Sequence, residues 1–278
     1  MPNKKRVLVF GSSGSIGSEL VRQLSEHNSV YCVDIDDVSN FDLIEELKMK
    51  GKNVEGRCGN IRDQSTVDEV FSDYKPHYVY HAAAYKVVTS GERTPMEYIQ
   101  TNVIGLWNVI AAAKRLPVEK FVFISSDKAA TANSVMGITK KMGEVLVRNQ
   151  GKGFVVVRFG NVMGSRGSVL PLWQNQMNRG EPITVTDARM ERYMMTIPEA
   201  VSLVIDAGDK GEGGEIFILD TGRKVNVLEL AQEIVKKSGK NHRIDIIGVR
   251  EGETLTERWM TDEEEKVAIK HEKHWIIK

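Results

Sequence analysis

The sequence predicts an α/β protein: a Rossmann-type, doubly wound parallel sheet with a smaller C-terminal substrate-binding lobe. Three observations support this fold class. Short apolar runs alternate with segments of helical periodicity as far as Arg158, which is typical of a parallel sheet covered by helices on both faces. A glycine-rich turn joins the first apolar run to the first helical segment. After Arg158, glycines, prolines and single charges become scattered, which indicates a different, smaller unit.

The strands expected in the first part are short and mostly apolar. The continuous apolar run Val7–Phe10 indicates a strand buried on both faces. The other expected strands are 29–33, a short one near Val54, 78–80, 120–124 and 154–158. Helices are expected between them, at 16–24, 41–50, 65–71, 96–114 and 135–149.

The second part contains fewer and shorter expected elements. Helices are predicted at 170–178, 197–207 and 227–238, and strands at 183–186, 215–219 and 243–247. We therefore expect a cofactor-binding domain over residues 1–160 and a substrate lobe over 161–278 whose elements interleave with the first domain. A ligand would lie in the cleft between them, at the carboxyl ends of the strands. The charged tail 262–278 is expected to be peripheral.

Composition excludes several classes of function. The 278 residues carry 38 basic and 38 acidic side chains, so no overall charge attracts nucleic acid or a membrane surface. No stretch approaches the ~18 apolar residues of a membrane span, and the chain is expected to be cytoplasmic. Cys32 and Cys58 are expected to be reduced core thiols. The histidines show no metal-ligand spacing, so no metal is expected.

The turn Gly11-x-x-Gly14-x-x-Gly17 predicts a dinucleotide site. Gly11 would permit the tight turn, Gly14 the approach of the pyrophosphate to the backbone, and Gly17 close packing of the helix. The helix N-terminus would face the negative charge. We expect the turn residues between these glycines to share in binding, namely Ser13, Ser15 and Ile16.

Asp34 follows Gly17 by seventeen residues, at the end of the next expected strand. A carboxylate there binds the adenosine ribose hydroxyls and repels a 2′-phosphate, so NAD is favoured over NADP. Asp36 and Asp37 add negative charge and could equally cap the following helix. Asn60 and Ile61 are expected at the adenine edge. The small residues Ala82, Ala83 and Ala84 would let a dinucleotide lie across the fourth strand.

Ser126, Asp127 and Lys128 follow a buried strand directly, and Lys140 lies twelve residues beyond Lys128. The position four residues before Lys140, where a Tyr-x-x-x-Lys dehydrogenase site has its tyrosine, is occupied by Met136. A thioether carries no proton, so proton transfers in such a site would depend on the triplet. The alternative interpretation of Asp127 and Lys128 is a solvated turn or a helix cap, and that of Met136 is a space-filling core residue.

Several motifs in order resemble the extended short-chain dehydrogenase/reductases of the polysaccharide-biosynthesis type. They include the glycine turn, His81-Ala82-Ala83-Ala84-Tyr85-Lys86, Thr101-Asn102-Val103, Ser125-Ser126-Asp127-Lys128-Ala129, Arg158-Phe159-Gly160-Asn161-Val162, Gly164 to Val169 and Arg192-Tyr193-x-Met195-Thr196. More narrowly, the chain is similar to the soluble, C5-retaining UDP-N-acetylglucosamine 4,6-dehydratases. It departs from the usual pattern at Phe10, Asn60 and Ser126, where threonine, aspartate and threonine are common.

This resemblance implies roles for the triplet. Asp127 would protonate the leaving C6 hydroxyl, Lys128 would take the C5 proton, and Ser126 would contact the C4 hydroxyl. Asp127 must then be protonated and Lys128 neutral, which requires opposite pKa shifts; because the two attract each other, they should titrate together. Lys140 would hold the nicotinamide ribose, and the resemblance places Asn102 among the cofactor-binding residues.

The UDP-sugar implied by the resemblance needs donors for two phosphates. Arg166, Gly167 and Ser168 stand just before an expected helix, which suits an anion. Glu253 belongs to a turn that resembles the family's Arg-Pro-Gly-Glu, which meets UDP. The remaining substrate candidates are Lys86, Asn161, Arg192 and Arg250, although a surface ion pair is the commoner role for a single arginine.

Three alternatives remain open. A C5-inverting dehydratase usually keeps the tyrosine, and a UDP-sugar 4-epimerase needs no acid for a leaving hydroxyl. A non-catalytic NAD-binding regulator would need the glycine turn but not the triplet. The resemblance also implies a homodimer formed by the two long helices, 96–114 and 135–149.

Overall fold

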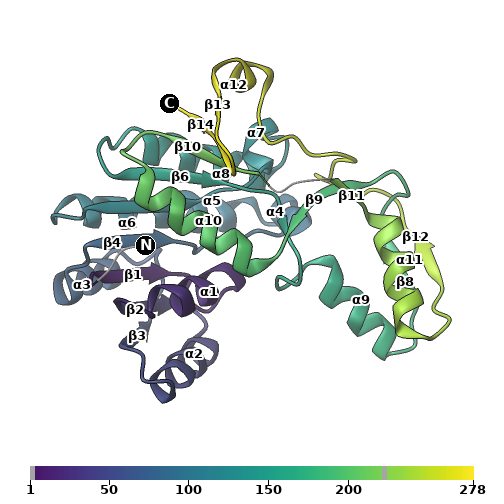
Figure 1. Ribbon diagram of the computed structural model, residues 1–278, viewed down its shortest axis with the longest axis horizontal. Coiled ribbons are helices and arrows are strands. Elements are labelled where there is room, and N and C mark those ends of the chain that lie inside the picture. Colours follow the sequence, from purple (N-terminus) through teal and green to yellow (C-terminus); the bar gives the residue numbers. More distant parts are fainter. Residues whose placement is uncertain (1–3, 221–223) are drawn as a thin grey trace.

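The computed structural model describes residues 4–220 and 224–278. Its main sheet has nine strands in the order β13-β14-β10-β6-β5-β4-β1-β2-β3 (Figure 1). The strands are β1 (Arg6–Phe10), β2 (Ser29–Asp34), β3 (Val54–Cys58), β4 (Tyr78–His81), β5 (Lys120–Ile124), β6 (Phe154–Arg158), β10 (Ile216–Leu219), β13 (Ile269–Lys270) and β14 (His274–Ile277). From β3 to β10 all pairings are parallel. This confirms the predicted doubly wound sheet, in which the strand order reverses between β1 and β4.

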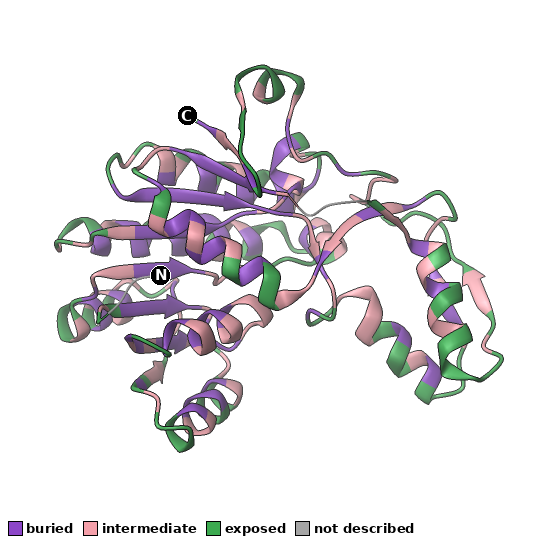
Figure 2. Ribbon diagram, in the orientation of Figure 1, coloured by how far each residue is buried: buried purple, intermediate pink, exposed green. Residues whose placement is uncertain are grey.

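Helices cover both faces of the sheet, as the strand and helix alternation predicted. On one face, α1 (Ser15–Leu24), α2 (Asp37–Met49) and α10 (Ile197–Lys210) contribute Leu20, Leu43 and Val201 to one core cluster. On the other, α3 (Gln64–Tyr74), α6 (Leu106–Lys114) and α8 (Val135–Arg148) pack Val67, Leu106 and Val147 against the sheet. The inner strands β1, β4, β5, β6 and β10 are almost entirely buried, whereas β3 at the edge is mostly not (Figure 2).

Two expectations about helices needed correction. The helix α2 begins at Asp37 rather than Phe41 because Asp36 caps it, accepting a hydrogen bond from the Ser39 backbone N–H at 3.1 Å. The single helix expected over 96–114 is divided into α5 (Pro95–Ile99), a π-helical segment η1 (Gln100–Gly105) and α6. Such π segments occur frequently at functional sites.

The C-terminal tail is not peripheral, contrary to the prediction. His274–Ile277 forms β14, which pairs antiparallel with β10 in the main sheet, and Ile277 is buried. Helix α12 (Asp262–Val267) precedes it. The expectation for Cys58 was also wrong, because Cys58 is exposed, whereas Cys32 is a buried thiol.

The smaller lobe has a core of its own and lies beside the carboxyl ends of the main strands (Figure 1). Helices α9 (Val169–Asn178) and α11 (Val227–Ser238) pack on the two-stranded sheet of β8 (Ile183–Val185) and β12 (Ile244–Ile246) around the buried Trp173. A three-stranded sheet, β11-β9-β7, joins it to the main body through β7 (Asn161–Val162), β9 (Glu191–Met195) and β11 (Lys224–Asn226). The short helices α4 (Val88–Arg93) and α7 (Lys128–Thr131), which the sequence did not predict, lie near the same edge.

Candidate active site

The glycine turn has the geometry that the sequence predicted. Gly11 adopts φ +76°, which side chains rarely tolerate, and a Cβ on Gly17 would lie 1.9 Å from the Gly11 carbonyl oxygen. Gly14 is the residue before α1, so the N-terminus of this helix faces the main cavity. The cavity measures about 460 Å³, and the turn contributes Gly14, Ser15, Ile16 and Gly17 to its wall.

Asp34 lies at the end of β2, next to the glycine turn. Its carboxylate accepts hydrogen bonds from the backbone N–H groups of Ser13 at 2.9 Å and Asp36 at 3.0 Å. These hydrogen bonds hold the Asp34 carboxylate between the turn that follows β1 and the turn that follows β2. The residues present could hold a dinucleotide, because they combine a turn that closes tightly, a helix N-terminus and a carboxylate.

Seven of the residues predicted to bind the cofactor do not line the cavity, namely Gly11, Ser13, Asp34, Asn60, Ile61, Ala83 and Asn102. The Asn60 side chain accepts from the Arg62 N–H at 3.0 Å, and Ile61 is buried in the core. Asn102 is buried; its amide accepts from the Tyr85 N–H at 2.8 Å and donates to the Tyr85 carbonyl at 2.9 Å. Asn102 therefore positions the segment after β4 instead of facing the ligand. That segment lines the cavity with Ala82 and Ala84, while Ala83 packs against the core.

Asp127 lies at the floor of the cavity, buried at the C-terminal end of β5. Its Oδ1 accepts hydrogen bonds from Ser126 Oγ at 2.9 Å and from the Lys128 backbone N–H at 2.9 Å. Asp127 is also the cap of α7, so the structural interpretation holds together with a catalytic one. Its other oxygen, Oδ2, is buried and has no hydrogen-bond donor among the described residues.

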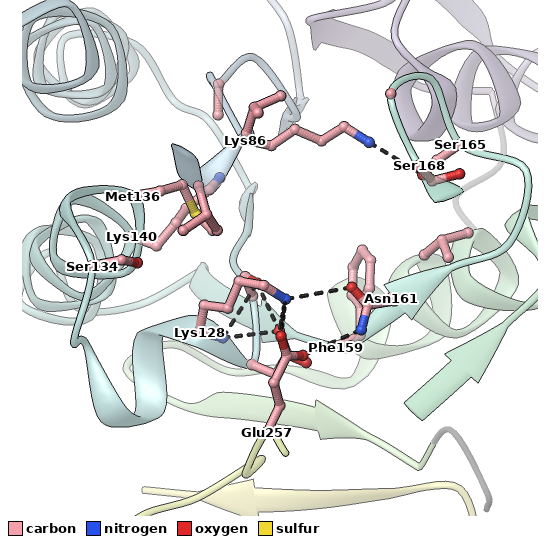
Figure 3. Close-up of a pocket in the computed structure, with 18 of the residues that line it drawn as sticks. Lys86, Lys128, Ser134, Met136, Lys140, Phe159, Asn161, Ser165, Ser168 and Glu257 are labelled. Atoms are coloured by element: carbon pink, nitrogen blue, oxygen red, sulfur yellow. Dashed lines mark hydrogen bonds and ion pairs between the residues drawn. The ribbon is translucent and has the colours of Figure 1, made fainter. Parts of the chain in front are cut away.

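The Lys128 ammonium group lies between three side chains (Figure 3). Its Nζ is 3.2 Å from Asp127 Oδ1, 2.8 Å from Glu257 Oε1 and 3.4 Å from Asn161 Oδ1. Asn161 also donates from Nδ2 to Glu257 Oε2 at 3.2 Å. Glu257 is buried, and the sequence reasoning missed it because no motif surrounds it and it is remote from the triplet in the chain.

Burial and neighbouring charges separate the pKa values of the two carboxyl groups. Burial raises the pKa of Asp127 to about 7; the Lys128 charge opposes this shift, and the neighbouring Glu257 reinforces it. Burial would also raise the pKa of Glu257, but the charges of Lys128 and Arg192 and hydrogen bonds lower it to about 2.

The surroundings of Lys128 favour its charged form, whereas its predicted role as a base requires the neutral amine. Burial lowers the pKa of its amine, but the nearby carboxylates of Asp127 and Glu257 outweigh this effect and raise it. A charged Lys128 is therefore favoured until one of its protons is transferred. The titrations of Asp127 and Lys128, which were predicted to depend on each other, therefore also depend on the charge of Glu257.

Met136 and Lys140 face the cavity from α8. Met136 is 2% exposed and occupies the wall of the cavity, which agrees with its interpretation as a space-filling residue. The Lys140 ammonium donates to the Ile124 carbonyl at 2.7 Å. Burial lowers its pKa to about 8, so its charge is available in the cavity near neutral pH.

The loop between β7 and α9 brings several predicted substrate residues to the opposite wall. Lys86 donates to Ser165 Oγ at 3.1 Å (Figure 3). Gly167 and Ser168 line both the main cavity and an adjoining one of about 210 Å³. The Ser168 hydroxyl is buried, caps no backbone group of α9, and has no hydrogen-bond partner among the described residues. Arg166, by contrast, points to the glycine turn, where it donates to the Ser13 carbonyl at 2.8 Å.

The two other arginines predicted to bind the substrate, Arg192 and Arg250, differ in exposure and in the hydrogen bonds that they make. Arg192 is buried and donates to the carbonyls of Thr254 at 2.7 Å and Leu255 at 3.0 Å, and its Nε lies 3.3 Å from Glu257. It mainly holds the chain that carries Glu257, and it also lines both cavities, so its role in binding a substrate stays a prediction. Arg250 is exposed and lines both cavities, and its backbone N–H donates to the Glu253 carboxylate at 3.3 Å.

Comparison with known sequences assigns the family. The family described as polysaccharide biosynthesis protein matches residues 7–278. The chain belongs to this family. A relative of the family, the capsular polysaccharide biosynthesis protein CapD of Staphylococcus aureus, is 42% identical over 273 residues, which cover 94% of this chain and 46% of CapD. The chain thus spans about half the length of this relative. Within the described residues, no helix has the length and apolar character needed to cross a bilayer.

The chain is also similar to an enzyme of known name and to a protein of known structure. The UDP-glucose 4-epimerase of Rickettsia canadensis is 33% identical, covering 94% of this chain and 79% of the epimerase. The crystal structure of Pen from Bacillus thuringiensis has a TM-score of 0.92 and 37% identity, covering 99% of this chain and 88% of Pen. The fold is therefore that of a short-chain dehydrogenase/reductase.

In this family member, a buried ion network fixes the segment that carries Glu257. Arg158, fully buried at the end of β6, makes paired hydrogen bonds to Glu144 of α8 at 2.9 and 2.7 Å and to Glu264 of α12 at 2.7 and 3.0 Å. It also donates to the Trp259 carbonyl at 2.8 Å. Glu144 in turn accepts from Ser125 Oγ at 2.7 Å. One arginine therefore connects the residue before the triplet with the chain just after Glu257.

Proposed function

We propose that this protein is an NAD-dependent UDP-N-acetylglucosamine 4,6-dehydratase that retains the configuration at C5. The observation that carries the proposal is the Asp127–Lys128 pair at the floor of the cavity, beside Met136 in the place of a proton-carrying tyrosine. An acid and an amine are what water elimination next to a ketone requires. The likeness in sequence to CapD supports a role in polysaccharide biosynthesis, and the likeness to the Rickettsia UDP-glucose 4-epimerase supports a UDP-sugar substrate.

NAD, when bound, would accept hydride from C4 of the sugar and return it to C6. The glycine turn, Asp34 and Lys140 would hold it. Ser126 would bind the C4 hydroxyl, Lys128 would take the C5 proton, and Asp127 would give its proton to the departing C6 hydroxyl. The raised pKa of Asp127, about 7, suits an acid that must hold its proton near neutral pH.

The UDP moiety would occupy the junction of the two cavities. The unpartnered Ser168 hydroxyl and the N-terminus of α9 form a neutral anion site. Arg250 adds a positive charge from the rim, and Glu253 would accept from the ribose hydroxyls. The smaller cavity is lined by Leu170, Thr184 and Thr186, which combine apolar surface with hydroxyl groups suited to a flat polar ring.

A second candidate is a UDP-sugar 4-epimerase, which the 33% identity to the Rickettsia enzyme favours. An epimerase does not remove a hydroxyl, however, and gains nothing from an acid whose pKa is near 7. The C5-inverting dehydratase and the non-catalytic NAD-binding regulator complete the alternatives.

Incubation with UDP-N-acetylglucosamine separates these candidates. A retaining dehydratase yields a 4-keto-6-deoxy sugar, detected by its absorbance in alkali and by proton NMR, with the original configuration at C5. A C4 epimer formed without loss of water would establish the UDP-sugar 4-epimerase. A keto sugar with inverted configuration at C5 would establish the C5-inverting dehydratase. The absence of any conversion would favour the non-catalytic NAD-binding regulator. In the Lys128→Ala variant we expect a loss of about 10²- to 10⁴-fold in kcat; activity near that of the wild type would contradict the assigned base.

We also propose a homodimer through α5, η1, α6 and α8. These elements expose large apolar side chains on the outside of the sheet layer, namely Met96, Ile104, Trp107, Ile138, Met142 and Val145. Apolar residues gathered on adjacent helices of a surface are typical of a buried interface.

A further inference from the structure

Glu257 makes the catalytic pair into a cluster of three ionisable groups. Its carboxylate is buried in the cavity wall, 2.8 Å from the Lys128 ammonium. The same Oε1 lies 3.3 Å from Arg192 Nε, and Oε2 accepts from Asn161 at 3.2 Å. Glu257 thus has two cationic groups at Oε1 and an amide donor at Oε2, which is the environment of an ionised carboxylate.

Asp127 is in the opposite situation. Its Oδ2 is buried and receives no hydrogen bond from any described donor, and its Oδ1 shares the Lys128 ammonium group with Glu257 Oε1. A buried carboxylate oxygen without a donor favours the protonated, uncharged form of the group. Since Glu257 has donors at both of its oxygens and Asp127 Oδ2 has none, Asp127 is the carboxyl group on which a proton is favoured.

We propose that Glu257 is a positioning residue that forms the ion pair with Lys128. Because Glu257 is the counter-ion of this lysine, Asp127 remains protonated and can act as the acid. The inference rests on the proposed function and deepens it. Without Glu257, Asp127 would be the nearest counter-ion of Lys128, and an aspartate ionised by that lysine has no proton to give to a leaving hydroxyl.

The same contact provides a route to the neutral amine. A proton can move from Lys128 Nζ to Glu257 Oε1 across their 2.8 Å separation, breaking an N–H bond and forming an O–H bond. The ammonium–carboxylate pair becomes an amine and a carboxylic acid, with no change in total charge or proton number. Exclusion of water by a bound sugar favours the neutral pair. Lys128 can then take the C5 proton while Asp127 still holds its own.

Charged groups face Glu257 from the elements that surround it. They are Asp127 before α7, Lys128 within it and Arg192 on β9, with Lys86 as a further cation across the cavity. The pKa of Lys86 is lowered by burial and then by the charge of Lys128. The segment 257–264 is held by Arg158 through the Trp259 carbonyl and Glu264, so Glu257 stands on a fixed support.

The test compares Glu257→Gln with Glu251→Gln, which removes the same charge from an exposed position of the same loop. For Glu257→Gln we expect the alkaline limb of the pH profile of kcat to move down by about 1 unit or more, because Asp127 loses its anionic neighbour and pairs with Lys128. At a fixed pH above that limb, kcat should fall by about 10-fold or more. Glu251→Gln should leave the alkaline limb at its wild-type pH. Glu257→Asp keeps the negative charge, so its alkaline limb should lie between those of the wild type and Glu257→Gln. An unchanged limb in Glu257→Gln would overturn the inference.

A second measurement does not depend on turnover. In protein labelled with ¹³C at the aspartate carboxyl carbon, the Asp127 signal, assigned by its absence in Asp127→Asn, should titrate near pH 7 and about 1 unit lower in Glu257→Gln. Equal titration in both proteins would refute the role of Glu257. If the wild type gives this titration but no keto sugar, the proposed function fails while the protonation scheme stands.

Discussion

The Arg166 guanidinium donates to the Ser13 carbonyl at 2.8 Å and lies 3.3 Å from the Asp36 carboxylate. The Arg166 backbone N–H also donates to Ser15 Oγ at 2.9 Å. The loop before α9 is thereby fastened to the glycine turn, so a residue of the smaller lobe lies at the edge of the proposed cofactor site. This contact joins the two halves of the candidate active site.

We expect Arg166→Ala to release NAD, the proposed cofactor, about 5-fold faster, because an exposed ion pair contributes up to about 1 kcal/mol. Stopped-flow fluorescence of bound NADH would measure the dissociation rate. The exposed Arg179, at the end of α9, provides a matched control, and Arg179→Ala should dissociate at the wild-type rate. Equal rates in all three proteins would show that the contact does not retain the cofactor.

The wild-type enzyme should lose activity as the pH rises through about 7. The pKa of Asp127 is raised to about 7, so the protonated form that acts as the acid predominates below this pH and is lost above it. Asp127→Asn keeps the shape of the side chain but has no proton to give, and kcat should fall about 10²- to 10⁴-fold. Initial rates of keto-sugar formation from pH 5 to 9 would test both. The same alkaline limb persisting in Asp127→Asn would assign it to another group.

Met136→Leu should retain activity within a few-fold of the wild type. Met136 is 2% exposed and fills the cavity wall, and swaps that conserve volume in a packed site usually cost below about 1.5 kcal/mol. Steady-state kcat and KM with UDP-N-acetylglucosamine would measure the effect. A loss of 100-fold or more would mean that the thioether does more than fill space.

Arg158→Met should destabilise the fold by about 3–5 kcal/mol, because removing one member of a buried ion network leaves the others charged and uncompensated. Here those partners are Glu144 and Glu264. The free energy of unfolding in urea would show the change. Arg22→Met breaks a surface pair with Glu46 and should cost below about 1 kcal/mol. Similar losses in the two variants would contradict the importance of burial.

Trp107→Glu should dissociate the proposed dimer, since a charge would be buried among the apolar side chains of α6 and α8. Sedimentation velocity would resolve dimer from monomer. Val267→Glu, on α12, changes another exposed apolar residue away from these helices and should leave the dimer intact. A monomeric wild type at micromolar concentration would disprove the interface.

Features that depend on neighbouring residues could be predicted from the sequence. The parallel strands, the helices between them and the glycine turn follow from apolar periodicity and from the backbone freedom of glycine. The triplet was located because strand β5 ends at Ile124 and polar residues follow at once. Parallel strands place such residues at one edge, so the sequence also indicated where Ser126, Asp127 and Lys128 would meet a ligand.

Only the tertiary structure decided which distant groups surround that triplet. Glu257 reaches Lys128, and His274 pairs with Leu219, across intervals that no local pattern encodes. A buried charge such as Arg158 reveals its role only when its carboxylate partners are known, because the cost of burial is offset by those contacts alone. The sequence by itself thus determined the sheet, the cofactor turn and the residues available for proton transfer. Their protonation states depend on which charges lie within a few ångströms, and that distance is set by the folded chain.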